Sequence, residues 1–357
     1  MILPDQSCIL VTGGAGFIGS AVIRHLIEKN FKKIVNVDAL TYAGNLSTLA
    51  GQSQYGGYVF EQVNICDQDA LRDVIKRHQP DAIMHLAAES HVDRSIDGPG
   101  LFIETNIKGT YNLLELIREE SAGRHTKSGR IRFHHVSTDE VYGSLGEQGL
   151  FVEDSPYQPN SPYSASKAAS DHLVRAWGET FGLDIVVSNC SNNYGPYQYP
   201  EKLIPVVIHR ALDEEPIPVY GKGDNVRDWL FVDDHARALV TVMQGGENGR
   251  TYNIGGDSER TNLEVVHGIC NVLDQLRPRA HGSYSSLIEF VTDRPGHDFR
   301  YAIDATRIKT ELDWSAKETF ESGLHETVSW YLSNQEWVAS VGGDGASSLR
   351  RGLGAGR

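Results

Sequence analysis

A glycine-rich turn between a short apolar run and a helical pattern constrains this chain more than any other feature. Residues 8–12 read Cys-Ile-Leu-Val-Thr, which is typical of a buried strand, and residues 21–29 have helical spacing. Between them, Gly13, Gly16 and Gly19 are spaced G-x-x-G-x-x-G. Such a turn lets backbone N–H groups and a helix N-terminus approach a pyrophosphate. The sequence therefore predicts a βαβ unit that binds a dinucleotide.

The residue that ends the second predicted strand indicates which dinucleotide is bound. This strand covers residues 33–37 and is followed by Asp38, which lies 19 residues beyond Gly19. A carboxylate at this position accepts hydrogen bonds from the ribose hydroxyls and repels a 2′-phosphate, so NAD is favoured over NADP. The alternative is a structural βαβ turn that binds no cofactor.

Strand-like and helix-like segments alternate along the first half of the chain. The strand-like runs are residues 58–63, 81–86, 130–137 and 184–189. The helical patterns are residues 67–78, 101–120 and 161–181. This alternation predicts a parallel, doubly wound α/β sheet whose site lies at the carboxyl ends of the strands. Segments that follow such ends are residues 87–94, 137–143 and 189–199.

Charge and cysteine usage exclude several classes of function. The chain has 33 Lys and Arg against 47 Asp and Glu, a formal net charge of −14, which disfavours bulk attraction to nucleic acid or to an anionic membrane. It has no apolar run of about 18 residues, so we expect no membrane span and a cytoplasmic location. We expect no metal site and no disulfide framework, because the cysteines are far apart and His91 and Asp93 offer only two oddly spaced ligands. The cysteines are Cys8, Cys66, Cys190 and Cys270.

Two short motifs carry groups suited to proton transfer. Tyr163 and Lys167 are four residues apart, so on a helix they share one face. A Lys ammonium beside a phenol favours the phenolate, which can then act as a base near neutral pH. Asp139 and Glu140 follow Thr138 and offer one acid and one base, because one ionised carboxylate raises the pKa of its neighbour. The alternative interpretation is a chance Tyr-x-x-x-Lys match and a solvated turn.

These features together resemble a known superfamily. The turn from Gly13 to Gly19, the Tyr163-x-x-x-Lys167 pair and the order of the elements are similar to the extended short-chain dehydrogenases/reductases. Within that superfamily, four stretches resemble the dTDP-glucose 4,6-dehydratases, and the similarity runs from about Ile9 to about Tyr331. The stretches are residues 85–95, 137–143, 188–197 with 200–205, and 293–298.

The resemblance implies a fold and a reaction. The fold is a Rossmann-type sheet with a smaller α/β substrate-binding domain towards the C-terminus. The reaction oxidises C4 of the hexose, removes water across C5 and C6 and returns the hydride to C6. Tyr163 would remove the O4 proton while Thr138 binds the same oxygen. Glu140 would act as base at C5, and Asp139 would protonate the leaving C6 hydroxyl.

The resemblance also assigns binding residues. The expected cofactor contacts are Gly13, Gly16, Phe17, Ile18, Gly19, Asp38, Asn64, Ile65, Leu86, Ala87, Ala88, Ser90, Thr105, Tyr163, Lys167 and Asn193. The expected substrate contacts are Ser90, Thr138, Asn192, Glu201, Lys202, Leu203, Pro218, Val219, Tyr220, Arg227, Asn262, Arg294 and His297. Asn64 departs from the family, which has Asp there, and its carbonyl oxygen would still accept from the adenine amino group.

The second half of the chain is less regular, with helical patterns at residues 201–213, 236–243 and 262–273 and strands at 218–223 and 251–254. We expect an NAD-binding domain over residues 1–190 with a return of 229–256. A nucleotide-sugar-binding domain would take residues 191–228 and 257–335, and residues 342–357 would form a disordered tail.

We expect a homodimer through helices 101–120 and 161–181. The alternatives are a UDP- or GDP-sugar dehydratase, a 4-epimerase, or a non-catalytic NAD sensor.

Overall fold

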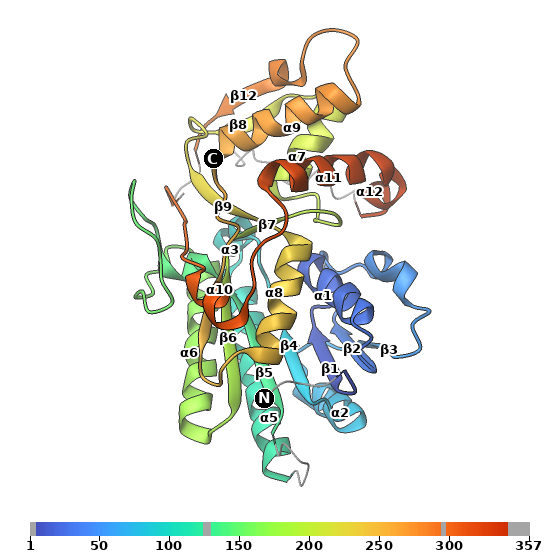
Figure 1. Ribbon diagram of the computed structural model, residues 1–357, viewed down its shortest axis with the longest axis vertical. Coiled ribbons are helices and arrows are strands. Elements are labelled where there is room, and N and C mark those ends of the chain that lie inside the picture. Colours follow the sequence, from blue (N-terminus) through green and yellow to red (C-terminus); the bar gives the residue numbers. More distant parts are fainter. Residues whose placement is uncertain (1–4, 124–129, 294–297, 342–357) are drawn as a thin grey trace.

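A seven-stranded sheet forms the larger part of the molecule (Figure 1). The computed structural model describes residues 5–123, 130–293 and 298–341, so Arg294, His297 and the tail 342–357 lie outside the described residues. The strand order is β3-β2-β1-β4-β5-β6-β10 and every neighbouring pair is parallel. The strands are β1 Cys8–Thr12, β2 Lys33–Asp38, β3 Tyr58–Gln62, β4 Ala82–His85, β5 Arg132–Thr138, β6 Asp184–Cys190 and β10 Thr251–Ile254. The order reverses between β1 and β4, which confirms the predicted Rossmann-type fold.

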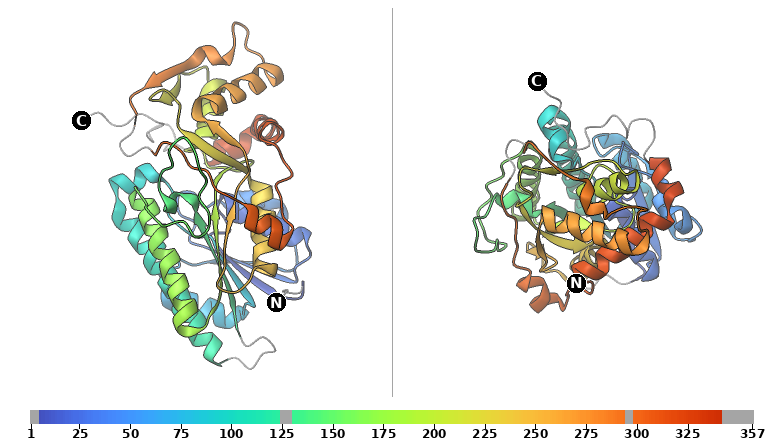
Figure 2. Two further views of the ribbon diagram at one scale, coloured as in Figure 1. Left: turned by 60° about the vertical axis from the view of Figure 1, so that its left-hand side comes forward. Right: turned by 90° about the horizontal axis from the view of Figure 1, so that it is seen from above.

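Both faces of the sheet are covered by helices, as the apolar strands require. Successive side chains of a strand point to opposite faces. In β1, Ile9 and Val11 pack into one cluster with α1 and α8, whereas Cys8 and Leu10 pack into another with α2 and α5. The covering helices are α1 Phe17–Glu28 and α8 Val232–Gly245 on one face, and α2 Gln68–His78, α5 Gly109–Gly123 and α6 Pro162–Phe181 on the other. Figure 2 shows α5 and α6 running together along one outer side.

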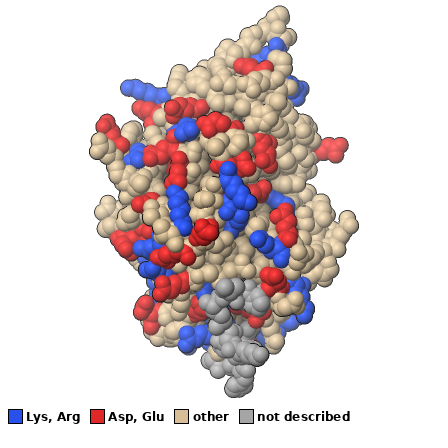
Figure 3. Space-filling model, in the orientation of Figure 1, with Lys and Arg blue, Asp and Glu red and all other residues tan. Residues whose placement is uncertain are grey.

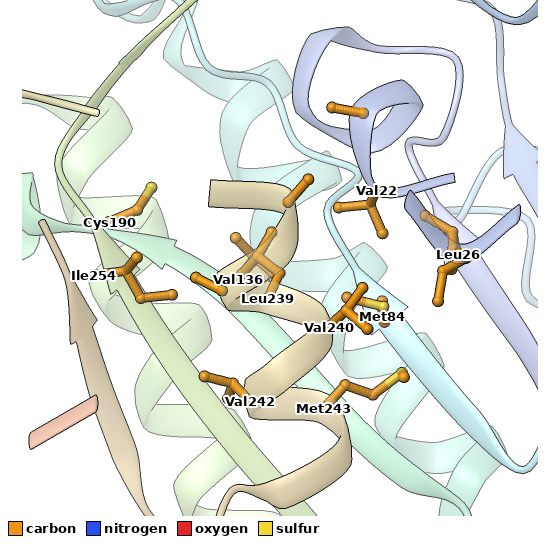
Figure 4. Close-up of a cluster of buried hydrophobic side chains, with 14 of the residues drawn as sticks. Val22, Leu26, Met84, Val136, Cys190, Leu239, Val240, Val242, Met243 and Ile254 are labelled. Carbon is orange, nitrogen blue, oxygen red and sulfur yellow. The ribbon is translucent and has the colours of Figure 1, made fainter. Parts of the chain in front are cut away.

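Helix α8 closes one face of the sheet although it comes late in the chain. Figure 4 shows Leu239, Val240 and Met243 of α8 beside Met84 of β4 and near α1. All four side chains are fully buried. Burying each such side chain contributes about 1.5–3 kcal/mol relative to leaving it in water. The segment from 232 to 254 is therefore an integral part of the half that contains the seven-stranded sheet.

A smaller unit lies above the carboxyl ends of the sheet in Figure 1. It contains a three-stranded sheet in the order β11-β9-β7 and a two-stranded sheet β12-β8. Its own apolar cluster joins α7, α9 and α11 to β9. The elements are β7 Asn192–Tyr194, β8 Ile217–Tyr220, β9 Val226–Phe231, β11 Glu259–Thr261, β12 Ile288–Val291, α7 Leu203–Leu212, α9 Asn262–Leu276, η4 Tyr284–Leu287, α11 Phe320–Ser333 and α12 Gln335–Val341. None of the helices in the described ranges is long and apolar enough to cross a bilayer.

The chain passes between the two units several times. After β9 it returns to the larger sheet as α8 and β10, within the range 229–256 where a return was expected. It returns again as α10 Thr306–Leu312, which packs beside β10 and α8. Ala305, Ile308 and Trp314 join the same apolar cluster as α1 and α8. This later return falls inside the residues that the sequence assigned to the smaller domain.

The long helix expected over residues 101–120 is present, but it is not α-helical throughout. The structure has α4 Pro99–Phe102, a π-helix η2 Ile103–Lys108, and then α5. The wide turn is held by Asn106, whose side chain accepts from the backbone N–H of Glu89 at 2.9 Å and donates to its carbonyl at 3.0 Å. The carbonyl of Asn106 also accepts from the hydroxyls of Thr110 and Ser170. Such turns recur at functional sites, and this one carries Thr105 into the cavity described below.

Candidate active site

A cavity of about 490 Å³ lies at the carboxyl ends of the large sheet, where the strand order reverses. This is the place where doubly wound sheets bind ligands. The structure brings every expected cofactor contact to its wall. These residues are Gly13, Gly16, Phe17, Ile18, Gly19, Asp38, Asn64, Ile65, Leu86, Ala87, Ala88, Ser90, Thr105, Tyr163, Lys167 and Asn193.

The glycine turn is packed so closely against neighbouring backbone that side chains at Gly13 and Gly19 would not fit. Gly13 has φ +72°, and a Cβ there would lie 2.7 Å from the backbone nitrogen of Ala87. A Cβ on Gly19 would lie 2.1 Å from the carbonyl oxygen of Gly13, so the helix sits directly on the turn. In the described chain no side chain caps the N-terminus of α1 at Gly16. Its first N–H groups therefore suit an anionic ligand, and the turn fits the pyrophosphate of a dinucleotide.

The carboxylate of Asp38 is held in place at the end of β2. One oxygen accepts from the N–H of Ala15 at 2.9 Å and the other from the N–H of Leu40 at 2.8 Å. Burial raises the pKa of Asp38, and these two hydrogen bonds oppose the rise. Each oxygen keeps a second lone pair that can accept from a ribose hydroxyl. The side-chain oxygen of Asn64, expected at the adenine edge, likewise accepts one N–H, from Cys66 at 2.9 Å, and keeps a second lone pair.

The two adjacent carboxyl groups lie on a short 3-10 helix, η3 Asp139–Tyr142, at the end of β5. Thr138 caps this helix by accepting from the N–H of Glu140 at 3.3 Å, and Asn189 donates to the Thr138 carbonyl at 3.1 Å. Burial raises the pKa of Asp139 well above its usual value. The charges of Glu140 and Asp228 add to the rise, and Arg227 opposes it. The environment thus favours the protonated form of Asp139, while Glu140 also lines the cavity.

Tyr163 and Lys167 lie one turn apart on α6, and both line the cavity. Burial raises the pKa of Tyr163 well above its usual value, Glu140 and Cys190 add to the rise, and a hydrogen bond with Thr138 opposes it. Lys167 donates to the carbonyl of Val136 at 2.9 Å. Burial therefore opposes the phenolate that the neighbouring Lys167 is expected to favour, and the role of Lys167 stays a prediction.

The expected substrate contacts divide into two groups. Ser90, Thr138, Asn192, Glu201 and Lys202 line the cavity. The remaining described ones belong to the smaller unit and do not line this cavity, so their roles stay predictions. They are Leu203, Pro218, Val219, Tyr220, Arg227 and Asn262. Arg294 and His297 fall outside the described residues.

Two residues of that second group have clear structural surroundings. Val219 is buried in the apolar core of the smaller unit. The Arg227 guanidinium donates to the carbonyls of Val226 at 2.7 Å and Asp298 at 2.9 Å. It also lies 4.3 Å from the ring centre of Tyr301. Arg227 is thus firmly oriented, and its charge acts on Asp139 in the adjacent cavity.

Sequence reasoning missed a polar bridge across the cavity wall. Arg94, on α3 Val92–Asp97, lies 3.7 Å from the ring centre of Tyr42, in the loop after β2. Its Nε is 3.4 Å from a carboxylate oxygen of Glu201, and the Tyr42 hydroxyl donates to Glu201 at 3.2 Å. Glu201, expected to contact substrate, therefore ties the smaller unit to two loops of the larger sheet. Tyr42 comes after the end of β2, and Arg94 comes after the end of β4. Their positions after strand ends were the sequence signal that could have identified them as residues of the site.

The sequence analysis also missed other residues of the cavity wall, which lie at or after the ends of strands. Ser137 is the last but one residue of β5, Cys190 ends β6, and Ser191 comes next. Gln198 lines the cavity from the loop after β7 and donates to the carbonyl of Asn193 at 2.9 Å. The predicted site segment 189–199 included Cys190, Ser191 and Gln198, but the sequence analysis did not single them out as site residues. Within the described ranges, no group of three His, Cys, Asp or Glu side chains is arranged to hold a metal ion.

The seven-stranded sheet is of the Rossmann type, and its glycine turn and the Tyr163–Lys167 pair meet in one cavity. These features define an extended short-chain dehydrogenase/reductase. The chain belongs, more narrowly, to the GDP-mannose 4,6 dehydratase family, whose model matches residues 10–327. It is 59% identical over 343 residues to dTDP-glucose 4,6-dehydratase 1 of Escherichia coli K12, covering 93% of this chain and 95% of that protein.

Solved structures agree with this assignment. The dTDP-glucose 4,6-dehydratase of Bacillus anthracis in complex with NAD is 46% identical, with a TM-score of 0.82 over 93% of this chain and 98% of that chain. The dTDP-glucose 4,6-dehydratase of Streptomyces venezuelae with NAD and TYD bound is 43% identical. Its TM-score is 0.85 over 93% of this chain and 99% of that chain.

Proposed function

We propose that this chain is an NAD-dependent dTDP-glucose 4,6-dehydratase, which forms dTDP-4-keto-6-deoxyglucose and water. The observation that carries the proposal is the pair Asp139 and Glu140 beside Tyr163 in one cavity. Removing water from a hexose requires an acid for the leaving hydroxyl and a base for the neighbouring C–H. The buried Asp139 suits the acid, because its environment favours the protonated form.

The cavity residues fit NAD as the resident cofactor. The turn from Gly13 to Gly19 and the N-terminus of α1 would hold the pyrophosphate, and Asp38 would accept from the ribose hydroxyls. Lys167 and Asn193 also line the cavity. Bound NAD supplies a reversible hydride acceptor and a positive charge.

Tyr163 and Thr138 serve the first half of the reaction. Tyr163 takes the proton from the C4 hydroxyl of the hexose, and Thr138 shares a hydrogen bond with Tyr163 that orients the phenol. The phenolate needs stabilisation because burial opposes it. The Thr138 hydrogen bond supplies part of this stabilisation, and the Lys167 ammonium one turn along the helix adds to it.

Glu140 and Asp139 serve the second half. A C4 ketone acidifies the C5 proton, which Glu140 removes as the base. Asp139 delivers its proton to the C6 hydroxyl, which leaves as water. Both carboxyl groups line the cavity, but each can play a different part because Asp139 is almost fully buried and Glu140 is partly exposed.

The nucleotide sugar carries two phosphates against a net charge of −14. On the face drawn in Figure 3, acidic and basic side chains are interspersed, and neither sign covers the whole face. Lys202 lines the cavity and donates to the carbonyl of Ser90 at 3.1 Å, which keeps its charge at the wall. We assign Lys202 to the diphosphate of the substrate on this ground.

The rival functions differ in their products. A 4-epimerase inverts C4 without losing water and has no need for Asp139 and Glu140 together. An NAD sensor needs neither these acids nor Tyr163. A UDP- or GDP-sugar dehydratase would share the chemistry and differ in the base that it accepts.

One experiment separates these cases. The purified protein is incubated with dTDP-, UDP- and GDP-hexoses, and the absorbance of the 4-keto product in alkali is followed. We expect the protein to form the 4-keto product from dTDP-glucose faster than from the UDP- or GDP-hexoses. Preferred turnover of another nucleotide would correct the substrate, inversion without a 4-keto product would favour the epimerase, and no product at all would refute the proposal.

We further propose that the chain acts as a homodimer. Helices α5 and α6 lie together along an outer side of the molecule (Figure 2), and they and their neighbours carry exposed apolar side chains. These are Ile96, Leu101, Ile103, Tyr111 and Phe181. Burying such side chains against a second copy is favourable. Light scattering that finds a monomer at micromolar concentration would contradict the dimer. The cytoplasmic location stays a prediction.

A further inference from the structure

Helix α6 carries a third buried polar residue in line with Tyr163 and Lys167. Asp171 lies one turn beyond Lys167 and two turns beyond Tyr163, so the three side chains share one face of the helix. Its side chain is completely buried. The mechanism above gives it no part, although a buried carboxylate is costly unless it is paired and hydrogen-bonded.

The carboxylate of Asp171 accepts hydrogen bonds from three other segments of the chain. His135 Nε2 of β5 lies 3.0 Å away and the Ser137 hydroxyl of the same strand lies 2.9 Å away. The Tyr157 hydroxyl, from the loop before α6, lies 2.8 Å away. Asn189 of β6 makes a longer contact at 3.5 Å and also donates to the carbonyl of Thr138. Asp171 thus connects α6 to the strand end that presents Thr138, Asp139 and Glu140.

Asp171 also lies one helical turn from a buried cation and acts on it through its charge. Lys167 is 4% exposed, and its ammonium donates to the carbonyl of Val136. The groups that face it are Asp171 on α6, Cys190 on β6, His85 on β4 and His135 on β5. Burial lowers the pKa of Lys167, and the Asp171 charge opposes that fall most strongly.

The protonation states around Lys167 follow from the same contacts. His85 is held neutral, because burial and then the charges of His135 and Lys167 lower its pKa well below the usual value. Burial lowers the pKa of His135 to about 4, so the neutral ring donates from Nε2. Burial acts to raise the pKa of Asp171, yet the hydrogen bonds and the Lys167 charge hold it below its usual value. Asp171 is therefore the anion of this cluster.

We propose that Asp171 is a positioning residue of the reaction: it is the buried counter-ion that keeps Lys167 cationic and fixes α6 against the end of β5. The inference rests on the proposed function, since it concerns the oxidation step that uses Tyr163. Asp171 is buried and does not line the cavity. It acts through Lys167 and through the strand that carries Thr138.

The variant Asp171→Asn tests the charge. Asn keeps the size of the side chain and one acceptor, and it removes the negative charge. We expect the rate of C4 oxidation, followed in a single turnover by the absorbance of reduced nicotinamide, to fall about 10²-fold. The loss of a counter-ion also lowers the pKa of Lys167, so the alkaline fall in rate should move to lower pH by about one unit.

Tyr157→Phe is the matched control. It removes one hydrogen bond to Asp171 and leaves the charge in place, so the rate should change less than about tenfold and the pH profile should not move. If both variants lose rate in parallel with unmoved pH profiles, Asp171 is merely structural and the proposal fails. Wild-type rate and pH profile in Asp171→Asn would equally overturn it.

A double-mutant cycle of protein stability tests the interaction between Asp171 and Lys167 without measuring catalysis. Thermal unfolding and hydrogen exchange over residues 132–140 are compared for Asp171→Asn, Lys167→Met and the double variant. If the two charges compensate each other, the double variant is more stable than Asp171→Asn alone. Additive losses would overturn the proposal, even where Asp171→Asn folds poorly. Failure of the wild type to make a 4-keto product would instead refute the proposed function and leave this cycle as the test of Asp171.

Discussion

Asp139 and Glu140 are consecutive in the chain but stand in different surroundings at one cavity. Asp139 is 1% exposed, whereas Glu140 is partly exposed. The 3-10 turn after Thr138 causes this, because it sends adjacent side chains in different directions. A protonated acid and an ionised base can therefore coexist one residue apart.

The variant Asp139→Asn tests the acid. Without a proton to give to the C6 hydroxyl, loss of water should slow about 10²–10⁴-fold. Glu140 remains, so the C5 proton should still exchange with solvent once C4 is oxidised. Mass spectrometry of the recovered nucleotide sugar in deuterated water would show this exchange. A variant that eliminates water at the wild-type rate would remove Asp139 from its role.

The variant Glu140→Gln tests the base and should give the opposite isotopic result. C4 oxidation should continue, because Tyr163 and Thr138 are intact. Removal of the C5 proton should fall about 10²–10⁴-fold, so neither deuterium at C5 nor loss of water should appear. Deuterium at C5 in this variant, at the level seen with Asp139→Asn, would mean that another group is the base.

Asp38→Asn should weaken the preference for NAD. The change keeps one acceptor and removes the charge that repels a 2′-phosphate. We expect the Kd for NAD to rise about tenfold, which corresponds to about 1.4 kcal/mol, and the discrimination against NADP to narrow. Calorimetry with both dinucleotides measures this. Asp69→Asn, a change at a side chain that is 95% exposed on α2, is the control and should leave both affinities as they are.

Arg94→Ala should release the bridge among Tyr42, Arg94 and Glu201. The guanidinium contacts both the Tyr42 ring and the Glu201 carboxylate, so its loss leaves only the Tyr42–Glu201 hydrogen bond of this bridge between the loop after β2 and the smaller unit. We expect bound NAD to dissociate about tenfold faster, from the loss of one cation–π contact and one ion pair. Displacement by excess labelled NAD gives the rate, and Arg77→Ala on α2 serves as the control. An unchanged rate in Arg94→Ala would show that the bridge does not retain the cofactor.

Buried histidines should make the fold sensitive to acid. Burial lowers the pKa of His135 to about 4 and of His235 to about 3, whereas the unfolded chain titrates near pH 6.5. Between these values the unfolded chain binds more protons, so the free energy of unfolding should fall as pH drops from about 6.5 to about 4. The loss is about 3 kcal/mol for each histidine at the lower limit. Denaturant titrations at several pH values measure it, and a flat profile would contradict it.

The large sheet was predictable because its strands are apolar on both faces. Cys8–Thr12 is buried throughout, and a continuous apolar run between turn signals has few other uses. The cavity wall followed from the same pattern, since Asp38, Thr138 and Asn193 all come at or after strand ends. Local sequence is enough to predict a site residue when its position at the end of a strand by itself brings it to the cavity.

The rest depends on contacts between distant segments. Strand β9 contains Arg227 and Asp228, both buried, and an alternation rule does not predict charged residues inside a core. The bridge joins Tyr42, Arg94 and Glu201, which no spacing relates. The π-turn at Asn106 exists because of its partners Glu89 and Ser170, which helical periodicity cannot represent.

The repeated passage of the chain between its two units constrains how it is made. Val136 and Val186 of the sheet are covered by α8, which comes from residues 232–245, and the edge strand β10 ends at Ile254. A polypeptide still on the ribosome with only its first 190 residues emerged would expose this apolar face to water. Translation must pass Ile254 before the face can close, so the nucleotide-binding half matures only after most of the gene has been read.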